Sequence, residues 1–297
     1  MSESSPLNPA QWRAAGNFFS WRQHSIFYRN DGAGDTALLL IHGFPTASWD
    51  FARVWPYLRK RFNRLVTLDM LGFGFSDKPS AHRYTLMEQA DLHEALLEKF
   101  GIKRVHILAH DYGVSVAQEL LARHLERRPG MVEIASVALL NGGLFPETHR
   151  MTSTQKLLRS PFGFLLQWLM NERRFGKSFS LVFGPQTKPS DDELKDFWGL
   201  VTCNKGHRIM HRLIAYIEER RKHRERWVGA LQKTKIPVRL INGPKDPVSG
   251  AHMVARYREL ITTPDVVSLP GIGHYPQTEA PLQVLQALSA FYEKLKV

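Results

Sequence analysis

An aspartate at a predicted turn between a strand and a helix is the residue best placed to act as a nucleophile. Residues 105–109 read as a buried strand and a helical pattern begins at Gly113, which leaves Asp111 in the turn. The small side chains of Ala109 and Gly113 flank the turn, as a nucleophile elbow requires, because the backbone of its central residue is strained. A carboxylate is ionised at neutral pH and can displace a leaving group from saturated carbon. Aspartate is also a common helix N-cap, so the turn alone leaves both roles open.

A histidine near the C-terminus is placed to serve as the general base. His274 lies in a glycine-rich loop, residues 269–276, just beyond the last predicted strand. A loop at that end of a strand would carry the imidazole over Asp111, where it could activate water. The chain has thirteen histidines, and a histidine taken at random is more often a surface residue, but only His274 has this position.

The imidazole also needs an acidic partner to orient it, and two strand ends could supply one. Asn141 follows the strand that ends near Leu140, and its amide cannot carry the charge. Asp246 follows the predicted strand 238–241. We therefore assign the acid to Asp246, against the alternative of an ordinary turn aspartate before a proline.

Two backbone N–H groups could stabilise an oxyanion beside the nucleophile. The segment His42-Gly43-Phe44-Pro45 follows the first long buried strand of the chain. A turn there can aim the N–H of Phe44 at the same point as the N–H of Tyr112, the residue after Asp111. Two such donors make an oxyanion hole.

Apolar, β-branched runs alternate with helical patterns along the chain, which is typical of a mostly parallel sheet with crossover helices. Short continuous apolar runs such as 38–41 fit strands that are buried on both faces. The pattern predicts an α/β fold with a central sheet of about eight strands and flanking helices. We expect strands near 25–29, 37–41, 64–68, 105–109, 134–140, 238–241 and 266–269, and helices near 49–61, 86–100, 113–127, 252–260 and 281–295.

The alternation breaks between about residues 145 and 228, where the pattern is helical and rich in aromatic residues. Strand periodicity then resumes. The simplest account is that residues 145–228 form a helical lid, inserted after the sixth strand and covering the strand ends. The core would then comprise residues 1–144 and 229–297.

The composition is that of an ordinary globular protein of 297 residues, with 43% hydrophobic and 23% charged residues. The single cysteine, Cys203, excludes an intrachain disulfide and a cysteine-based metal site. Residues 1–12 lack the apolar run of a signal peptide, and no apolar stretch reaches the ~18–20 residues that cross a bilayer. We therefore expect a soluble, cytoplasmic protein, a monomer or homodimer, that uses no metal and no cofactor.

The formal net charge of +12 raises the question of acidic partners. Much of the excess lies between Lys205 and Arg226, where a basic helix could attract anionic lipid or nucleic acid. Stacking aromatics do not alternate with these cations and no DNA-binding motif accompanies them, so we expect no nucleic-acid partner. A solvated cationic helix face is the favoured reading, and weak attraction to anionic membranes stays open.

With these residues in place, the chain resembles the epoxide hydrolase and haloalkane dehalogenase branch of the α/β-hydrolase superfamily, from about Phe19 to the C-terminus. The resemblance rests on His42-Gly43-Phe44-Pro45, on His110-Asp111-Tyr112-Gly113 and on the loop formed by residues 68–79. It implies the α/β-hydrolase fold and a covalent ester on the aspartate that water then cleaves. The chain is similar in particular to the mesoderm-specific transcript protein family, through residues 141–150, 182–185 and 226–231.

The resemblance implies an epoxide hydrolase-like reaction on a small apolar electrophile that lid side chains help to bind. Epoxide hydrolases use two lid tyrosines on the opening ring. Tyr216 stands where the second is expected, but no tyrosine stands near Arg159, where the first would be. Losing one donor to a developing oxyanion typically costs about 10²–10³ in rate. Besides Tyr216, the residues that we expect to contact substrate are His42, Trp168 and Trp198.

Halide displacement is the alternative within the same branch. Haloalkane dehalogenases hold the halide with a tryptophan next to the nucleophile and an asparagine after the His-Gly pair, and here those positions hold Tyr112 and Phe44. A lid tryptophan such as Trp168, Trp198 or Trp227 could supply one N–H. A third possibility is a different class of protein. The chain could keep the hydrolase fold but act as a weakly active or non-catalytic binding protein with affinity for membrane surfaces.

Overall fold

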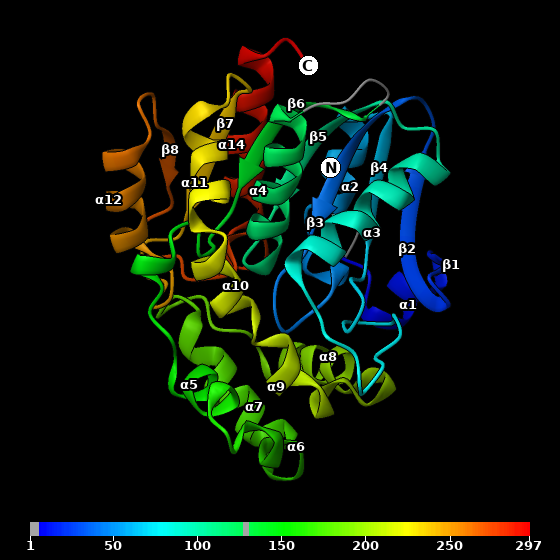
Figure 1. Cartoon of the computed structure of the whole chain (residues 1–297), viewed down its shortest axis with the longest axis vertical. Helices are drawn as coiled ribbons and strands as arrows, with labels where there is room; N and C mark the ends of the chain where they lie inside the picture. Colours follow the sequence, from blue (N-terminus) through cyan, green and yellow to red (C-terminus); the bar gives the residue numbers. More distant parts are fainter. Residues whose placement is uncertain (1–5, 127–130) are drawn as a thin grey trace.

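A mixed sheet of eight strands runs through the molecule, in the order β1-β2-β4-β3-β5-β6-β7-β8 (Figure 1). The computed structural model describes residues 6–126 and 131–297. Pairing is antiparallel between β1 and β2 and between β2 and β4, and parallel across the rest of the sheet. The strands are β1 (Asn17–Trp21), β2 (His24–Gly32), β3 (Thr36–Ile41), β4 (Arg64–Leu68), β5 (Arg104–Ala109), β6 (Glu133–Leu139), β7 (Val238–Asn242) and β8 (Asp265–Ser268).

Helices cover both faces of the sheet, so the central strands are buried on both sides (Figure 1). In β3, Leu39 and Ile41 belong to one core layer, whereas Leu38 and Leu40 belong to the other. This arrangement explains why continuous apolar runs, rather than alternating ones, mark these strands in the sequence. The flanking helices are α1 (Pro9–Ala14), η1 (Ser48–Phe51), α2 (Trp55–Arg61), α3 (Leu86–Lys99), α4 (Tyr112–Leu125), α11 (Arg224–Lys233), α12 (Ala251–Leu260), α13 (Pro276–Glu279) and α14 (Pro281–Lys294).

The predicted α/β fold, with a mostly parallel central sheet and flanking helices, is confirmed. The seven strands expected from the sequence correspond to β2–β8. The pattern did not locate β1, because the adjacent Phe18 and Phe19 of this edge strand interrupt the alternation of apolar and polar residues that marks a strand. The helix expected near 49–61 is divided into η1 and α2. Pro56 is the second residue of α2, and proline fits only the first turn of a helix.

Two parts of the sequence predictions concern residues outside the described ranges. The predicted helix 113–127 corresponds to α4 as far as Leu125, and its last residue, Arg127, lies outside the described residues. The first five residues of the N-terminal segment, for which no signal peptide was expected, also lie outside them.

A run of short helices between β6 and β7 lies beyond the carboxyl ends of the strands, and we call residues 146–223 the cap (Figure 1). The next helix, α11, packs against α4 on the sheet (Figure 1). The end of the lid, expected near residue 228, falls inside α11. The division of the chain into a core (1–144 and 229–297) and a lid (145–228) stays a prediction. Among the described residues, none of the helices combines the length and apolar character needed to cross a membrane. The cap elements are η2 (Pro146–Thr148), α5 (Ser153–Arg159), η3 (Gly163–Leu165), α6 (Leu166–Leu169), α7 (Glu172–Phe179), η4 (Ser180–Val182), α8 (Asp191–Thr202), η5 (Cys203–Arg208), α9 (Met210–Leu213) and α10 (Tyr216–Lys222).

A buried glutamate joins α4 to α11. Glu119 on α4 accepts hydrogen bonds from Nε of Arg226 at 2.7 Å and from Nε1 of Trp227 at 2.8 Å. It also accepts one from Nε of Arg123, one turn further along α4, at 2.8 Å. The side chain of Glu119 is only 3% exposed, so the protein rather than water compensates its charge. These contacts hold the helix that follows the cap against the helix that begins just after Asp111.

We expect Glu119→Ala to lower the free energy of unfolding by about 3 kcal/mol, because it leaves the buried indole of Trp227 without an acceptor and removes one carboxylate partner from each of two guanidinium groups. Urea-induced unfolding followed by circular dichroism measures the loss. Glu126→Ala is the matched control: Glu126 is 62% exposed and also pairs with Arg226, so its removal should cost at most about 1 kcal/mol. Equal losses in the two variants would contradict the role given to Glu119.

Candidate active site

Asp111 occupies a strained turn between β5 and α4. Its backbone has φ 47° and ψ −106°, and a positive φ is uncommon for residues other than glycine. Gly113 lies so close to the end of β3 that a side chain there would overlap the carbonyl oxygens of Ile41 and His42. The side chain of Asp111 makes no capping hydrogen bond to α4. The geometry therefore excludes the helix-cap role that the sequence left open.

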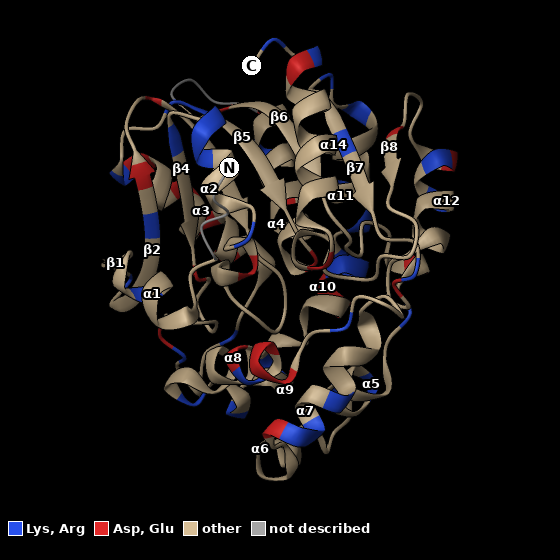
Figure 2. Ribbon diagram, turned by 180° about the vertical axis from the view of Figure 1, so that it is seen from behind, with Lys and Arg blue, Asp and Glu red and all other residues tan. Residues whose placement is uncertain are grey.

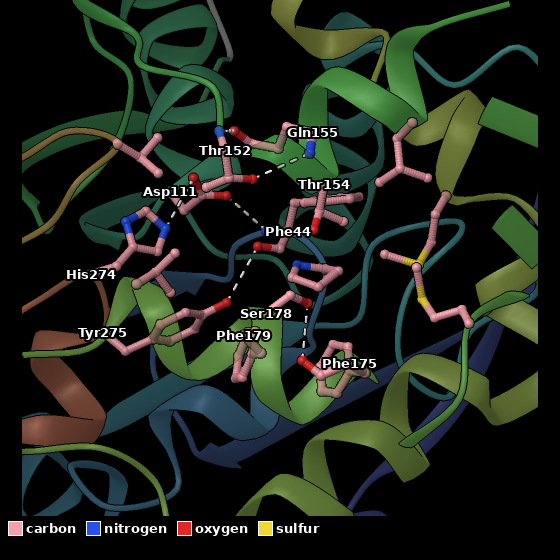
Figure 3. A pocket seen from close by; sticks show the side chains of 16 residues that line it. Phe44, Asp111, Thr152, Thr154, Gln155, Phe175, Ser178, Phe179, His274 and Tyr275 are labelled. Carbon is pink, nitrogen blue, oxygen red and sulfur yellow. Dashed lines mark hydrogen bonds and ion pairs between the residues drawn. The ribbon is translucent and has the colours of Figure 1, made fainter. Parts of the chain in front are cut away.

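The two carboxylate oxygens of Asp111 have different partners (Figure 3). Oδ1 accepts a hydrogen bond from the backbone N–H of Phe44 at 2.9 Å. Oδ2 lies 3.4 Å from Nε2 of His274. The N–H of Tyr112 is the first of α4, where a helix offers no internal acceptor. One oxygen is thus held by a backbone donor of the kind that forms an oxyanion hole, and the other faces the imidazole.

His274 lies between two carboxylates. Its Nδ1 donates a hydrogen bond to Oδ2 of Asp246 at 2.7 Å, while its Nε2 faces Asp111. The same oxygen of Asp246 also accepts hydrogen bonds from Oγ of Ser249 at 2.6 Å and from Nδ2 of Asn141 at 2.9 Å. The structure therefore brings together the three side chains that the sequence analysis selected from distant parts of the chain.

Contacts among these three groups outweigh the effect of their burial. Burial alone would raise the pKa of Asp246, but the charge and hydrogen bond of His274 lower it to about 2. Burial would also raise the pKa of Asp111, but the hydrogen bond and charge of His274 hold it well below its usual range. Burial disfavours the imidazolium, yet Asp246 and Asp111 raise the pKa of His274 to about 10. At neutral pH the site therefore holds one cation between two carboxylates.

A metal ion has no evident place in this arrangement of charges. Within the described ranges, no group of three or more His, Cys, Asp or Glu side chains is arranged to hold one. The polar atoms of His274 and Asp246 are instead engaged with each other and with neighbouring donors.

Asn141, which the sequence analysis rejected as the acid, links the nucleophile turn to the acid loop. Its backbone oxygen accepts the N–H of Asp111 at 2.8 Å. Its Nδ2 donates to Asp246, and its Oδ1 accepts the N–H of Gly243 at 2.6 Å. An amide suits this position because it offers a donor and an acceptor at the same time.

Arg220 contributes to the site although its sequence pattern placed it among the cations of a solvated helix face. The residue is only 2% exposed. Its Nη2 donates to the backbone oxygen of Asp111 at 2.8 Å and its Nε to Oγ of Ser115 at 2.7 Å, so it supports the strained turn from behind. Its exposed neighbours Arg221 and Lys222 have the same local pattern, and no sequence signal separates them from the buried residue.

Glu279 was also missed, and it fixes the loop that carries His274. Its Oε2 accepts the N–H groups of Gly273 and Gly184, both at 2.8 Å. Its Oε1 accepts the N–H of Tyr275 at 2.9 Å. Two of these donors flank His274, and Gly184 belongs to the cap. The carboxylate of Glu279 therefore connects the loop of His274 to the cap. No motif in the sequence predicts this contact.

A cavity lies over the carboxylate of Asp111 and the imidazole of His274 (Figure 3). The space open to the centres of water-sized molecules is about 80 Å³. Cap side chains form much of its wall, including the buried hydrophobic residues Leu158, Phe175 and Phe179. A wall of this kind suits a small, mostly apolar molecule with few polar groups. The polar side chains of the wall are Thr152, Thr154, Gln155 and Ser178 (Figure 3).

Two of the four residues expected to contact substrate are buried close to the cavity without lining it. The ring of Tyr216 lies 5.8 Å from that of Phe44, and its hydroxyl accepts a hydrogen bond at 3.4 Å from Nε2 of Gln155, which does line the cavity. Burial lowers the pKa of His42 to about 3. Its neutral ring accepts the N–H of Met70 at 3.0 Å, which is a structural contact.

The two tryptophans expected to contact substrate lie elsewhere in the cap. Trp168 is 69% exposed, on the short helix α6. Trp198, on α8, packs against Phe175 with a ring separation of 5.4 Å. Neither is among the residues that line the cavity. Aromatic residues in a helical lid pack or face solvent as readily as they face a ligand, and the sequence pattern does not distinguish these positions.

The chain is similar in sequence to proteins of one large family, as its motifs indicated. The family model described as alpha/beta hydrolase fold matches residues 36–281. The chain is 44% identical to the mesoderm-specific transcript homolog protein of Homo sapiens, over 96% of this chain and 88% of that protein. It is 40% identical to LipZ of Mycobacterium tuberculosis, a hydrolase by name, over 93% of this chain and 95% of that protein. Among solved structures, haloalkane dehalogenase DbeA from Bradyrhizobium elkani has a TM-score of 0.77 at 20% identity, over 95% of this chain and 98% of that chain, which shows a shared fold.

We expect the imidazole of His274 to titrate with a pKa of about 10 in the free protein, because two carboxylates stabilise its charged form. Asp111→Asn removes one of them and should lower that pKa by about 1–3. Titration of the imidazole nitrogens by NMR measures both values. Asp35→Asn is the control, since it removes an exposed carboxylate just before β3, at the opposite end of the sheet. A wild-type His274 that is already neutral at pH 7 would contradict the charged arrangement.

Proposed function

The chain belongs to the alpha/beta hydrolase fold family, and we propose that within it the protein is an epoxide hydrolase-like enzyme with Asp111 as its nucleophile. The proposed substrate is a small, mostly apolar epoxide that binds in the cavity beneath the cap. One observation carries the proposal: the carboxylate of Asp111 sits in a strained turn and lines the cavity, and it does not cap its own helix. Such a backbone conformation costs about 1–3 kcal/mol and persists where function depends on it.

In the first half of the proposed reaction, Oδ2 of Asp111 attacks a ring carbon of the epoxide. The bond from that carbon to the ring oxygen breaks, its electron pair passes to the oxygen, and an alkyl ester forms on the enzyme. Oδ1 keeps its hydrogen bond from the N–H of Phe44, which leaves Oδ2 as the attacking atom. The new alkoxide takes its proton from His274, whose pKa falls once the charge of Asp111 is lost in the ester.

The second half of the proposed reaction uses the neutral imidazole that results. His274, oriented by Asp246, takes a proton from water, and the oxygen of that water attacks Cγ of Asp111. The N–H groups of Phe44 and Tyr112 stabilise the negative charge that develops on Oδ1. The bond between Cγ and Oδ2 then breaks, and the diol leaves with the former Oδ2. The proton of the resulting carboxylic acid passes to the departing alkoxide, which restores the aspartate and the imidazolium.

Gln155, which lines the cavity, and Tyr216, whose buried hydroxyl lies 3.4 Å from Nε2 of Gln155, are the proposed hydrogen-bond donors to the oxygen of the opening ring. Burial raises the pKa of Tyr216, so its phenol stays protonated and can donate. Gln155 donates one N–H of its amide to that phenol and lines the cavity, and the same amide has a second N–H. In this proposal Gln155, on α5, takes the place of the tyrosine that is missing near Arg159.

The two alternatives have less support. Halide displacement needs N–H donors in the cavity, but the indole of Trp227 donates to Glu119, and Trp168 and Trp198 are not among the lining residues. A binding protein without catalysis has no use for a charged, strained nucleophile turn. A panel of styrene-type epoxides, haloalkanes and aryl esters distinguishes the three readings, and we expect turnover of the epoxides.

A single turnover in water enriched in heavy oxygen tests the two-step route. The label should appear in Asp111 and not in the first product, because the diol leaves with an oxygen of the carboxylate. Mass spectrometry of the peptide that contains Asp111 measures it. Asp111→Ala should abolish turnover, whereas His274→Gln should stop at the ester and add the mass of the substrate to the protein. Asp35→Ala, at an exposed position, is the control, and label found directly in the first product would exclude the covalent ester.

We expect Tyr216→Phe to lower kcat for an epoxide by about 10²–10³, because the opening ring loses one donor to its oxygen. Steady-state kinetics measures the loss, and Gln155→Leu in the same background should lower kcat further. Tyr257→Phe is the matched control, since Tyr257 is also a buried tyrosine but lies on α12. Undiminished epoxide turnover by Tyr216→Phe would show that other groups stabilise the ring oxygen.

A further inference from the structure

The cap carries an exposed apolar surface at its end farthest from the sheet, around α6 (Figure 1). Six of the eleven large hydrophobic side chains that are exposed in the described part of the chain fall within residues 157–169. Single exposed hydrophobic residues are ordinary, but a cluster of them marks an interaction surface. We call this cluster the cap tip. Its members are Leu157, Phe162, Phe164, Leu165, Trp168 and Leu169.

Basic residues on α5 and α7 lie close to the cap tip (Figure 2). Residues 151–188 contain six Lys and Arg residues and a single acidic residue, Glu172. Arg159 forms an ion pair with Glu218, whereas the other five, within the described ranges, form no ion pair. These five are exposed, and the four on α5 and α7 make up the cationic rim: Lys156, Arg173, Arg174 and Lys177.

The segments that carry the cap tip also line the cavity. On α5, Leu157 is exposed, whereas the adjacent Leu158 is buried and lines the cavity. Trp168 and Leu169 are exposed, whereas the next residue, Met170, also lines the cavity. Two short segments therefore present apolar side chains both to the exterior and to the proposed substrate site.

We propose that the cap tip docks the protein on the surface of an anionic phospholipid bilayer. In this arrangement the aromatic and leucine side chains of the tip enter the interfacial layer, and the cationic rim contacts the headgroups. Aromatic residues bordered by Lys and Arg are the composition that a membrane interface favours. The basic segment between residues 205 and 226 offers charge alone, whereas the cap tip adds an apolar anchor. The proposal does not depend on Asp111 being a nucleophile.

A second copy of this chain is a poorer occupant of the cap tip than a bilayer. In a symmetric dimer the same surface of both copies forms the interface. The unpaired cations of the two rims would then face each other and repel. Anionic headgroups supply the opposite charge that the rim lacks within its own chain. Charge complementarity therefore favours a bilayer.

Sedimentation with lipid vesicles tests the docking on the intact chain. Vesicles of phosphatidylcholine with phosphatidylglycerol should bind it about tenfold or more tightly than vesicles of phosphatidylcholine alone. The combined variant Phe162→Ser, Trp168→Ser and Leu169→Ser should lose about tenfold or more in affinity for the anionic vesicles. Leu125→Ser with Leu282→Ser, which removes exposed leucines outside the cap, is the matched control and should bind as the wild type does. Equal binding by the two variants would overturn the proposal.

Charge reversal separates the rim from the net charge of the chain. Arg173→Glu with Lys177→Glu should weaken binding to the anionic vesicles by about tenfold. Lys233→Glu with Lys235→Glu changes the net charge by the same amount at the far end of the sheet, near the start of β7, and should bind as the wild type does. Circular dichroism checks that each variant is folded. Equal weakening by both pairs would mean that attraction is unspecific and that the cap tip is not the site.

Trp168 reports the contact directly. Of the seven tryptophans, all of which the structure describes, Trp168 is the exposed one. Brominated lipid should therefore quench part of the fluorescence of the wild type, and Trp168→Phe should remove that quenching while the protein still binds. Unchanged quenching in Trp168→Phe would overturn the proposal. A dimer that depends on the cap tip and does not bind vesicles would also overturn it.

Discussion

A buried imidazole between two buried carboxylates is the arrangement to which the rest of the site is fitted. Each of these charges would be costly to bury alone, because the protein interior does not replace the water that it loses. Together, His274, Asp111 and Asp246 compensate one another, and the pKa of the imidazole rises while those of the acids fall. The net charge of the group is that of a single anion, and an ester on Asp111 would bring it to zero.

The order of strands explains how these groups meet although they are far apart in the chain. Asp111 follows β5, Asp246 follows β7 and His274 follows β8, and the carboxyl ends of parallel strands lie along one edge of the sheet. β6 lies between β5 and β7, so Asn141, just beyond its end, is in position to bond both the nucleophile turn and the acid loop. The order of the strands thus explains the hydrogen bonds of Asn141. The carboxylate that orients His274 belongs to Asp246, which follows the neighbouring strand β7.

The sequence was informative where a functional residue directly follows a strongly apolar strand. The fold class and the convergence of Asp111, His274 and Asp246 could be predicted for this reason. Arg220 could not, because its partner is 109 residues away and its helix has the same charge pattern as a solvated one. The opposite error occurred at Trp168, which was expected to contact substrate but is exposed. The local sequence does not show whether an aromatic residue of the lid is buried. The edge strand β1 was not predicted either, because its adjacent Phe18 and Phe19 interrupt the alternation of apolar and polar residues that marks a strand.

The cap connects the electrostatics of the site with its exterior. Its inner face, with Leu158 and Phe175, forms an apolar wall over the charged groups, and charges attract and stabilise one another more strongly where water is excluded. Under the proposed function, the same wall would disfavour polar substrates and admit molecules that partition into lipid. If the outer face of the cap rests on a bilayer, such molecules reach the cavity from the phase in which they are most concentrated. The apolar character of both faces would then serve one purpose, the selection of lipophilic electrophiles.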